Sequence, residues 1–110
     1  MLYTSGSHSR PRLAQHVYNY MLTKEPHLKD VPIVVHHKRL TSEGVVGWCY
    51  HDDHEFTIEI ERALSRSNYI TTLIHELIHV RQTLSGLTCD VEREREAYTL
   101  EQIYSKDFND

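Results

Sequence analysis

Hydrophobic side chains recur every three or four positions over residues 10–25, and this spacing predicts an N-terminal helix. Pro11 suits the first turn, because a first-turn residue needs no backbone N–H donor, and Pro26 ends the helix. We expect the helix to cover one face of a sheet. Its apolar stripe consists of Leu13, Val17, Tyr20 and Met21.

The three segments that follow have the composition or the alternation of β-strands. Residues 31–37 (VPIVVHH) are rich in β-branched side chains, and residues 44–51 (GVVGWCYH) form a second such run. Residues 54–61 (HEFTIEIE) alternate apolar and polar side chains, which predicts a strand with one buried and one solvated face. For HDDH at residues 51–54 we predict a polar hairpin turn rather than a metal site, because aspartate favours turns and no nearby residue completes a ligand set.

A strongly apolar helix is predicted from Ser67 or Asn68 to about Ser85. Ser67 or Asn68 can cap the first turn, and Gly86 is expected to end the helix. Apolar side chains surround most of its circumference, so we expect the helix to be largely buried. They are Ile70, Leu73, Ile74, Leu77, Ile78 and Leu84.

A last helix is predicted over residues 91–104, with Ala97, Leu100, Ile103 and Tyr104 on one stripe. Residues 1–9 and 105–110 carry no comparable pattern, and we expect them to be flexible tails. The order of a helix, three strands and two helices predicts one α+β domain over residues 1–110. We expect its three-stranded sheet to be mainly antiparallel.

Composition and charge exclude several classes of function. The chain has 110 residues and a formal net charge of -4, so it lacks the basic excess that displaces counterions from nucleic acid. No apolar run approaches the roughly 20 residues that a membrane-spanning helix needs. The N-terminal segment does not have the order of a signal peptide. We therefore expect a cytoplasmic monomer that binds neither membranes nor nucleic acid strongly.

The chain also contains nine histidines and two cysteines. His8, His16 and His27 lie among polar residues, and we expect them to be solvated. Cys49 and Cys89 are far apart in the sequence and form no CxxC motif. We expect two reduced thiols, with one disulfide as the alternative.

The segment HELIH, from His75 to His79, carries the clearest chemistry. Residues four apart on a helix share a face, so His75 and His79 can each offer a ring nitrogen to one metal ion. Glu76 lies about 100° round the helix from His75, where its carboxylate can reach a metal-bound water. The alternative is a pair of core histidines bonded to backbone or carboxylate groups. Burial of the helix favours the metal, since buried histidines need polar partners.

A catalytic zinc ion commonly takes three protein ligands and leaves a fourth position for water. The last helix contains EREREA at residues 92–97, and helices joined by a short loop pack antiparallel. Most of these charges are expected to be solvated, but Glu96 precedes Ala97, whose small side chain permits close approach of the helices. Glu92, one turn earlier, and Asp90 are reserve candidates. We predict one zinc ion per chain, held by His75, His79 and one of these acidic residues, with Glu96 as the first candidate.

HELIH followed by a Glu-Ala pair on the next helix resembles the glutamate zincins, metallopeptidases that bind zinc through two histidines and one glutamate. The stretch 44–86 is similar to the SprT-like metallopeptidase domain, in which short strands lead into a TLxHELxH helix, often with a following glutamine such as Gln82. Small domains of the ImmA/IrrE type share the motif and an E-x-E-A segment, which residues 94–97 match. The resemblance covers residues 31–101.

This resemblance implies a minimal zincin-like fold and a zinc metallopeptidase that acts on a protein or peptide substrate. It implies His75, His79 and Glu96 as the zinc ligands and Glu76 as the general base. It also suggests that the 54–60 strand edges the substrate cleft, where an extended peptide can pair with it.

Some expectations stay open. A second donor for the oxyanion is expected, and Tyr98, Tyr104 and His37 are the candidates. The alternative functions are a zinc-binding interaction module with little turnover and a metal-free interaction domain in which the motif is accidental.

Overall fold

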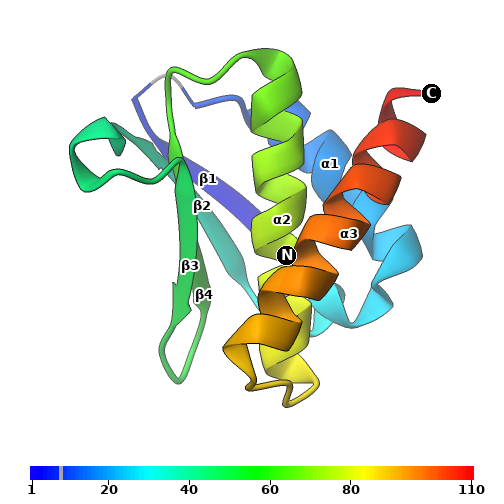
Figure 1. Ribbon diagram of the computed structural model, residues 1–110. Coiled ribbons are helices and arrows are strands. Elements are labelled where there is room, and N and C mark those ends of the chain that lie inside the picture. The colour runs from blue at the N-terminus through cyan, green and yellow to red at the C-terminus, as the bar shows by residue number, and fades with distance from the viewer. Residues whose placement is uncertain (8) are drawn as a thin grey trace.

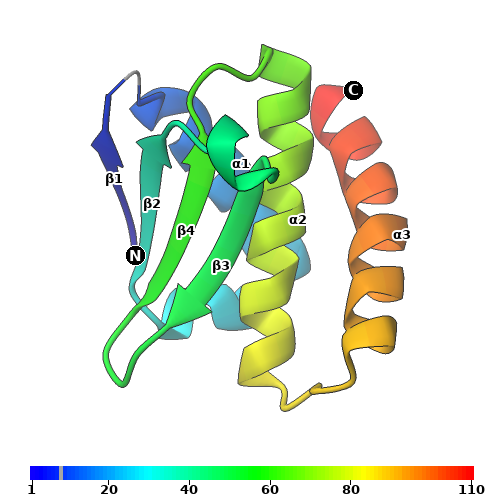
Figure 2. The same ribbon diagram turned by 60° about the vertical axis from the view of Figure 1, so that its left-hand side comes forward.

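The computed structural model describes residues 1–7 and 9–110, so the expectation for His8 lies outside the described residues. His16 and His27 are exposed, as predicted. Figures 1 and 2 show helices packed beside a sheet, which confirms the α+β class. The elements are β1 (Leu2–Gly6), α1 (Pro11–Lys24), η1 (Pro26–Asp30), β2 (Ile33–Lys38), η2 (Thr41–Glu43), β3 (Gly47–His51), β4 (Phe56–Glu61), α2 (Arg66–Leu84) and α3 (Asp90–Asn109).

The sheet has four strands in the order β1-β2-β4-β3. β1 pairs with β2 and β2 pairs with β4 in parallel, whereas β3 and β4 form an antiparallel pair. The prediction of a three-stranded, mainly antiparallel sheet is therefore wrong. The three expected strands exist, but β2 and β4 are not sequence neighbours, and periodicity along one strand carries no information about its partner.

β1 occupies a segment for which we expected a flexible tail. Its residues pair with Ile33–His37 along the whole strand, and the terminal amino group donates a 3.0 Å hydrogen bond to the hydroxyl of Tyr18. Gly6 has a φ of +94°, and a Cβ there would lie 2.0 Å from the carbonyl oxygen of His37. Five residues with one large aliphatic side chain, Leu2, are too few to show a period, which is why the strand was missed.

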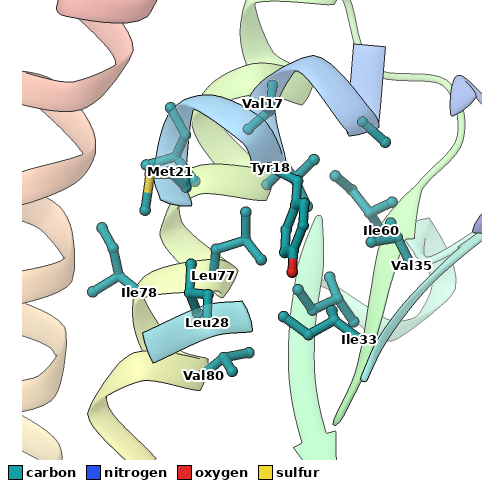
Figure 3. Close-up of a cluster of buried hydrophobic side chains, with 14 of the residues drawn as sticks. Val17, Tyr18, Met21, Leu28, Ile33, Val35, Ile60, Leu77, Ile78 and Val80 are labelled. Carbon is teal, nitrogen blue, oxygen red and sulfur yellow. The ribbon is translucent and has the colours of Figure 1, made fainter. Parts of the chain in front are cut away.

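α1 and α2 cover one face of the sheet, and α3 packs on the side of α2 that faces away from the strands (Figures 1 and 2). The predicted N-terminal helix is thus confirmed. Burial of apolar side chains between these layers supplies the main driving force for folding. Figure 3 labels part of this buried cluster, namely Val17, Tyr18, Met21, Leu28, Ile33, Val35, Ile60, Leu77, Ile78 and Val80.

α2 begins earlier than predicted. Its N-cap is Ser65, whose hydroxyl accepts a 3.2 Å hydrogen bond from the backbone N–H of Asn68. The helix ends at Leu84, and Gly86 follows in the left-handed conformation with a φ of +81°, as predicted for a helix stop. The expected burial is also confirmed, because α2 is enclosed between the sheet, α1 and α3.

α3 extends beyond the predicted range, through a segment for which we expected a flexible tail. The ring of Phe108 packs edge-on against that of Tyr20, with centroids 5.6 Å apart. Asp107 accepts a 2.8 Å hydrogen bond from the hydroxyl of the same tyrosine. These contacts attach the last turn of α3 to α1, a partner that is distant in the sequence.

The HDDH segment forms the predicted polar turn between β3 and β4. The backbone N–H groups of His54 and Glu55 both donate to Asp52 Oδ1, at 2.7 and 2.9 Å. Cys49 and Cys89 are free, as expected. Within residues 1–7 and 9–110, no helix combines the length and the apolar character needed to cross a membrane.

Candidate metal centre

His75 and His79 lie on the side of α2 that faces α3. Apolar residues of α2 fill the sheet side of the helix, so the histidines, four apart, project together toward the second layer. Their rings meet edge to face with centroids 4.7 Å apart, and their Nε2 atoms are 3.1 Å apart. The predicted pair of ligands is therefore brought together.

Glu94 of α3 supplies the third group. One of its carboxylate oxygens lies 2.9 Å from His79 Nε2, and the other lies 3.6 Å from His75 Nε2. The three candidate ligand atoms all lie within 4.8 Å of one another. Donor atoms about 2.0–2.1 Å from a tetrahedral zinc ion are roughly 3.3 Å apart, so the spacing suits this ion.

Glu96, the predicted third ligand, does not reach the histidines. Its Oε1 accepts a 2.9 Å hydrogen bond from Gln82 Nε2 and lies 2.9 Å from Arg81 Nη2. Two residues of a helix turn it by about 200°, so Glu94 and Glu96 cannot both face α2 in the same way. The reserve candidates Glu92 and Asp90 are exposed and do not belong to the cluster of ligand atoms.

A signal for Glu94 was nevertheless present in the sequence. Ala97 was expected at the helix contact, and it is fully buried. The residues three positions before and four positions after Ala97 lie on the same face of the helix, and these residues are Glu94 and Glu101. The prediction instead used the neighbour of Ala97 in the sequence, and i and i+1 do not face the same way on a helix.

The outer nitrogen of each histidine has a hydrogen-bond acceptor. His75 Nδ1 donates to Glu101 Oε1 at 2.9 Å, and His79 Nδ1 donates to Gln82 Oε1 at 2.8 Å. The direction of the second bond follows from Gln82, whose amide nitrogen is used as a donor to Glu96 and to the Arg93 carbonyl. Both inner nitrogens therefore present lone pairs toward Glu94 when the rings are neutral.

This arrangement suits a cation. Two unprotonated Nε2 atoms and a carboxylate are all hydrogen-bond acceptors, and acceptors that converge without a proton repel one another. Burial lowers the pKa of His79, which favours the neutral, metal-binding form of its ring over a protonated one. The donor set of two imidazoles and one carboxylate fits zinc.

Glu76 lies beside the cluster and is 5% exposed. Burial, and then the charges of Glu94 and Glu101, raise the pKa of Glu76 to about 8. Among the described residues its carboxylate has no hydrogen-bond partner. Gly47 allows β3 to lie close to α2 beside Glu76. A Cβ at Gly47 would clash with Thr72 Cγ2 at 2.8 Å and would lie in contact with Glu76 Cγ at 3.5 Å.

Two hollows flank His75 and Glu76, between β3 on one side and α3 on the other; Figure 2 shows these two elements on either side of α2. The Val46 hollow, of about 370 Å³, is lined by Gly44, Val45, Val46, Gly47, Thr72, His75, Glu76, Tyr98 and Glu101. The Trp48 hollow, of about 390 Å³, is lined by Gly47, Trp48, Cys49, His75, Glu76, His79, Asp90, Arg93, Glu94 and Tyr98.

The strand that borders the two hollows is β3, and not the 54–60 strand that the resemblance suggested. β4 lies inside the sheet with partners on both sides, so its backbone groups are already paired. β3 is an edge strand, and Gly47 belongs to the lining of both hollows.

One of the three candidate oxyanion donors lies at the cleft. The ring of Tyr98 packs against that of His75 with centroids 4.9 Å apart, and the residue lines both hollows. Tyr104 donates a hydrogen bond to Glu25 instead. His37 is buried elsewhere, where it contacts the carbonyl of Ser5 and the hydroxyl of Tyr69.

No family model, curated protein or solved structure matches this chain.

Proposed function

We propose that this protein is a zinc-dependent metallopeptidase with the ligands His75, His79 and Glu94. The observation that carries the proposal is the convergence of three acceptor atoms beside Glu76, a buried carboxylate without a hydrogen-bond partner among the described residues. This combination is what metal-assisted hydrolysis requires: a ligand set with room for water, and a base next to that water.

The chemistry that zinc supplies when bound is an acidified water and a polarised carbonyl. Ionised Glu76 would accept a proton from the attacking water and return it to the leaving nitrogen, as general base and then general acid. The positive charge of bound zinc would favour this ionised form over the protonated one. Glu101 and Gln82 hold the two rings so that both Nε2 atoms face inward. Of the three predicted oxyanion donors, Tyr98 is the one that lines these hollows, and its hydroxyl can donate to the oxyanion.

The free edge of β3 supports a peptide as substrate. Two backbone hydrogen bonds at the ends of the β3–β4 pair show which β3 residues bond to β4. The N–H of Glu61 donates to the carbonyl of Val46, and the N–H of Asp52 donates to the carbonyl of Glu55. In this antiparallel register the N–H and C=O groups of Gly47 and Cys49 point away from β4. An extended chain can pair with them and pass beside Glu76.

A second candidate function is a zinc-binding interaction module of the same fold with little turnover. Tyr98 is 60% exposed, and its hydroxyl makes no hydrogen bond within the described part of the chain. An oxyanion donor that is not held in place contributes less to catalysis, because it must be ordered at the moment of reaction.

The variant Glu76→Gln tests the proposal. We expect zinc content to be unchanged and hydrolysis of a mixed peptide library to fall by at least about 100-fold, as is usual when a general base is removed. Glu92→Gln is the matched control, since Glu92 is an exposed glutamate on α3. Zinc in the wild type without hydrolysis of any peptide would support the binding module, and equal hydrolysis by Glu76→Gln would remove Glu76 from the mechanism.

A further inference from the structure

The Val46 hollow adjoins the reacting groups and has a composition that selects among substrate side chains. His75 and Glu76 form the part nearest the candidate metal centre, and Val46 lies on the β3 side. Its volume of about 370 Å³ is enough for one long side chain next to the scissile bond.

Glu101 presents one accessible carboxylate oxygen that no described residue binds. Glu101 is 7% exposed, and its Oε1 accepts the hydrogen bond from His75 Nδ1. Its Oε2 has no hydrogen-bond partner among residues 1–7 and 9–110, and it is not sealed from the hollow. Because this oxygen is still accessible, a cationic donor on a ligand can replace water there and form a charge-assisted hydrogen bond.

Charge and shape in the hollow both suit a basic side chain. The lining contains the acidic residue Glu101 and no lysine or arginine, and its other acidic residue, Glu76, has a raised pKa and contributes less negative charge at neutral pH. Val46, the methyl group of Thr72 and the ring of Tyr98 offer apolar surface for an aliphatic stem. The face of an aromatic ring also attracts a cation.

We propose that the Val46 hollow is a specificity subsite for a lysine or arginine side chain next to the scissile bond, with Glu101 as the residue that binds its cation. This inference rests on the proposed peptidase function. An acidic side chain is repelled by Glu101 at the same place, and a neutral side chain of equal length brings no charged donor to Glu101 Oε2.

Peptide binding to zinc-loaded Glu76→Gln protein tests the subsite without turnover. Calorimetry on peptides that carry lysine, norleucine or glutamate at each position in turn isolates the charge, because norleucine keeps the aliphatic length. We expect one position at which lysine binds about tenfold more tightly than norleucine, with glutamate weakest, since a hydrogen bond to a charged group is worth about that much. Equal binding of lysine and norleucine at every position overturns the inference.

Two substitutions, each made in the same Glu76→Gln background, locate the effect. Glu101→Gln keeps an oxygen acceptor for His75 but removes the charge, and we expect the preference for lysine over norleucine to fall to about one with zinc still bound. Val46→Lys places a cation at the hollow and is expected to reverse the order of lysine and glutamate. Ile103→Lys is the matched control, because Ile103 is 56% exposed on α3 and does not line the hollow. A preference for lysine that survives both Glu101→Gln and Val46→Lys overturns the assignment.

Cleavage by the wild type separates this inference from the proposed function. Hydrolysis without preference for a basic residue leaves the peptidase proposal standing and overturns the subsite. Preferential binding of lysine peptides without hydrolysis of any peptide supports the subsite and counts against the peptidase proposal. Neither binding nor hydrolysis of any peptide overturns both.

Discussion

Gln82 joins His79 to Glu96: its Oε1 accepts a hydrogen bond from His79 Nδ1 at 2.8 Å, and its Nε2 donates to Glu96 Oε1 at 2.9 Å. Glu96, which we predicted from the sequence as a ligand, therefore contacts Gln82 and not the histidines of the candidate metal centre. Glu96 holds the side chain of Gln82, which in turn holds the ring of His79, while Glu94 lies in the candidate ligand position.

Substitution of the two glutamates should separate these roles. We expect Glu94→Ala to weaken zinc binding by more than about 100-fold, because a ligand is removed. Glu96→Ala should weaken it by about tenfold or less, because Glu96 contacts only Gln82, and the direct partner of a metal-binding histidine itself contributes about 10–100-fold. Competition with a chelator measures both values. Glu92→Ala is the control, since this glutamate is exposed. Zinc retained by Glu94→Ala and lost by Glu96→Ala would restore the ligand set predicted from the sequence.

Gln82 itself should matter for zinc affinity and for stability. Gln82→Leu removes the acceptor of His79 Nδ1 and leaves the Arg93 carbonyl without the donor at 2.9 Å. We expect zinc affinity to fall about 10–100-fold and the free energy of unfolding to fall by about 1–3 kcal/mol. Chelator competition and urea denaturation measure the two effects. Gln102→Leu, at an exposed position of α3, should change neither.

Zinc should stabilise the folded chain. A ligand present at about 100 times its dissociation constant adds about 2.7 kcal/mol, which corresponds to a rise in Tm of about 10 °C or more for a domain of this size. Thermal denaturation with zinc and with a chelator measures the shift, and Glu94→Ala should abolish most of it. A wild-type Tm that does not respond to zinc would favour the metal-free alternative.

Alanine substitutions at Gly6 and Gly44 test how much the pairing of β1 with β2 contributes to stability. Both have a positive φ, +94° and +72°, but a Cβ at Gly6 would meet the His37 carbonyl at 2.0 Å, whereas a Cβ at Gly44 would meet nothing within 4 Å. Gly44→Ala should cost about 1–2 kcal/mol for the left-handed conformation alone. Gly6→Ala should cost clearly more, because β1 must shift away from β2. Equal losses in urea denaturation would mean that β1 contributes little to stability.

Glu61 should make stability depend on pH. Its carboxylate accepts backbone hydrogen bonds from Leu40 and Ala63, at 2.7 and 2.8 Å, and these bonds lower its pKa below the usual 4.5. Because the folded-state pKa is the lower one, the stabilisation is fully present above about pH 4.5 and is lost as the pH falls through the folded-state pKa. Glu61→Gln should be less stable than the wild type at pH 7, and the difference should shrink in acid.

Glu43→Gln is the control for this pH series, because Glu43 is exposed and accepts no hydrogen bond from the described residues. Denaturation curves between pH 3 and pH 7 are the measurement. A difference between Glu61→Gln and the wild type that stays constant over this range would show that the charge of Glu61 is not the cause.

The sequence by itself determined the elements whose residues repeat with a clear period or carry a local stop signal. The helix after Pro11, the strand that alternates Phe56 with its polar neighbours, and the end of α2 before Gly86 could all be predicted, because each depends on contacts within a few residues. The same holds for the pairing of His75 with His79, since helix geometry alone places them on one face.

Only the tertiary structure decided how these elements meet. β1 is a strand because β2 pairs with it, and the last turn of α3 is ordered because α1 packs against it; neither cause is local. Which glutamate faces the two histidines depends on the rotation of α3 about its axis. About 100° per residue separates Glu94 from Glu96 by nearly half a turn, and the packing of the buried Ala97 against α2 selects Glu94.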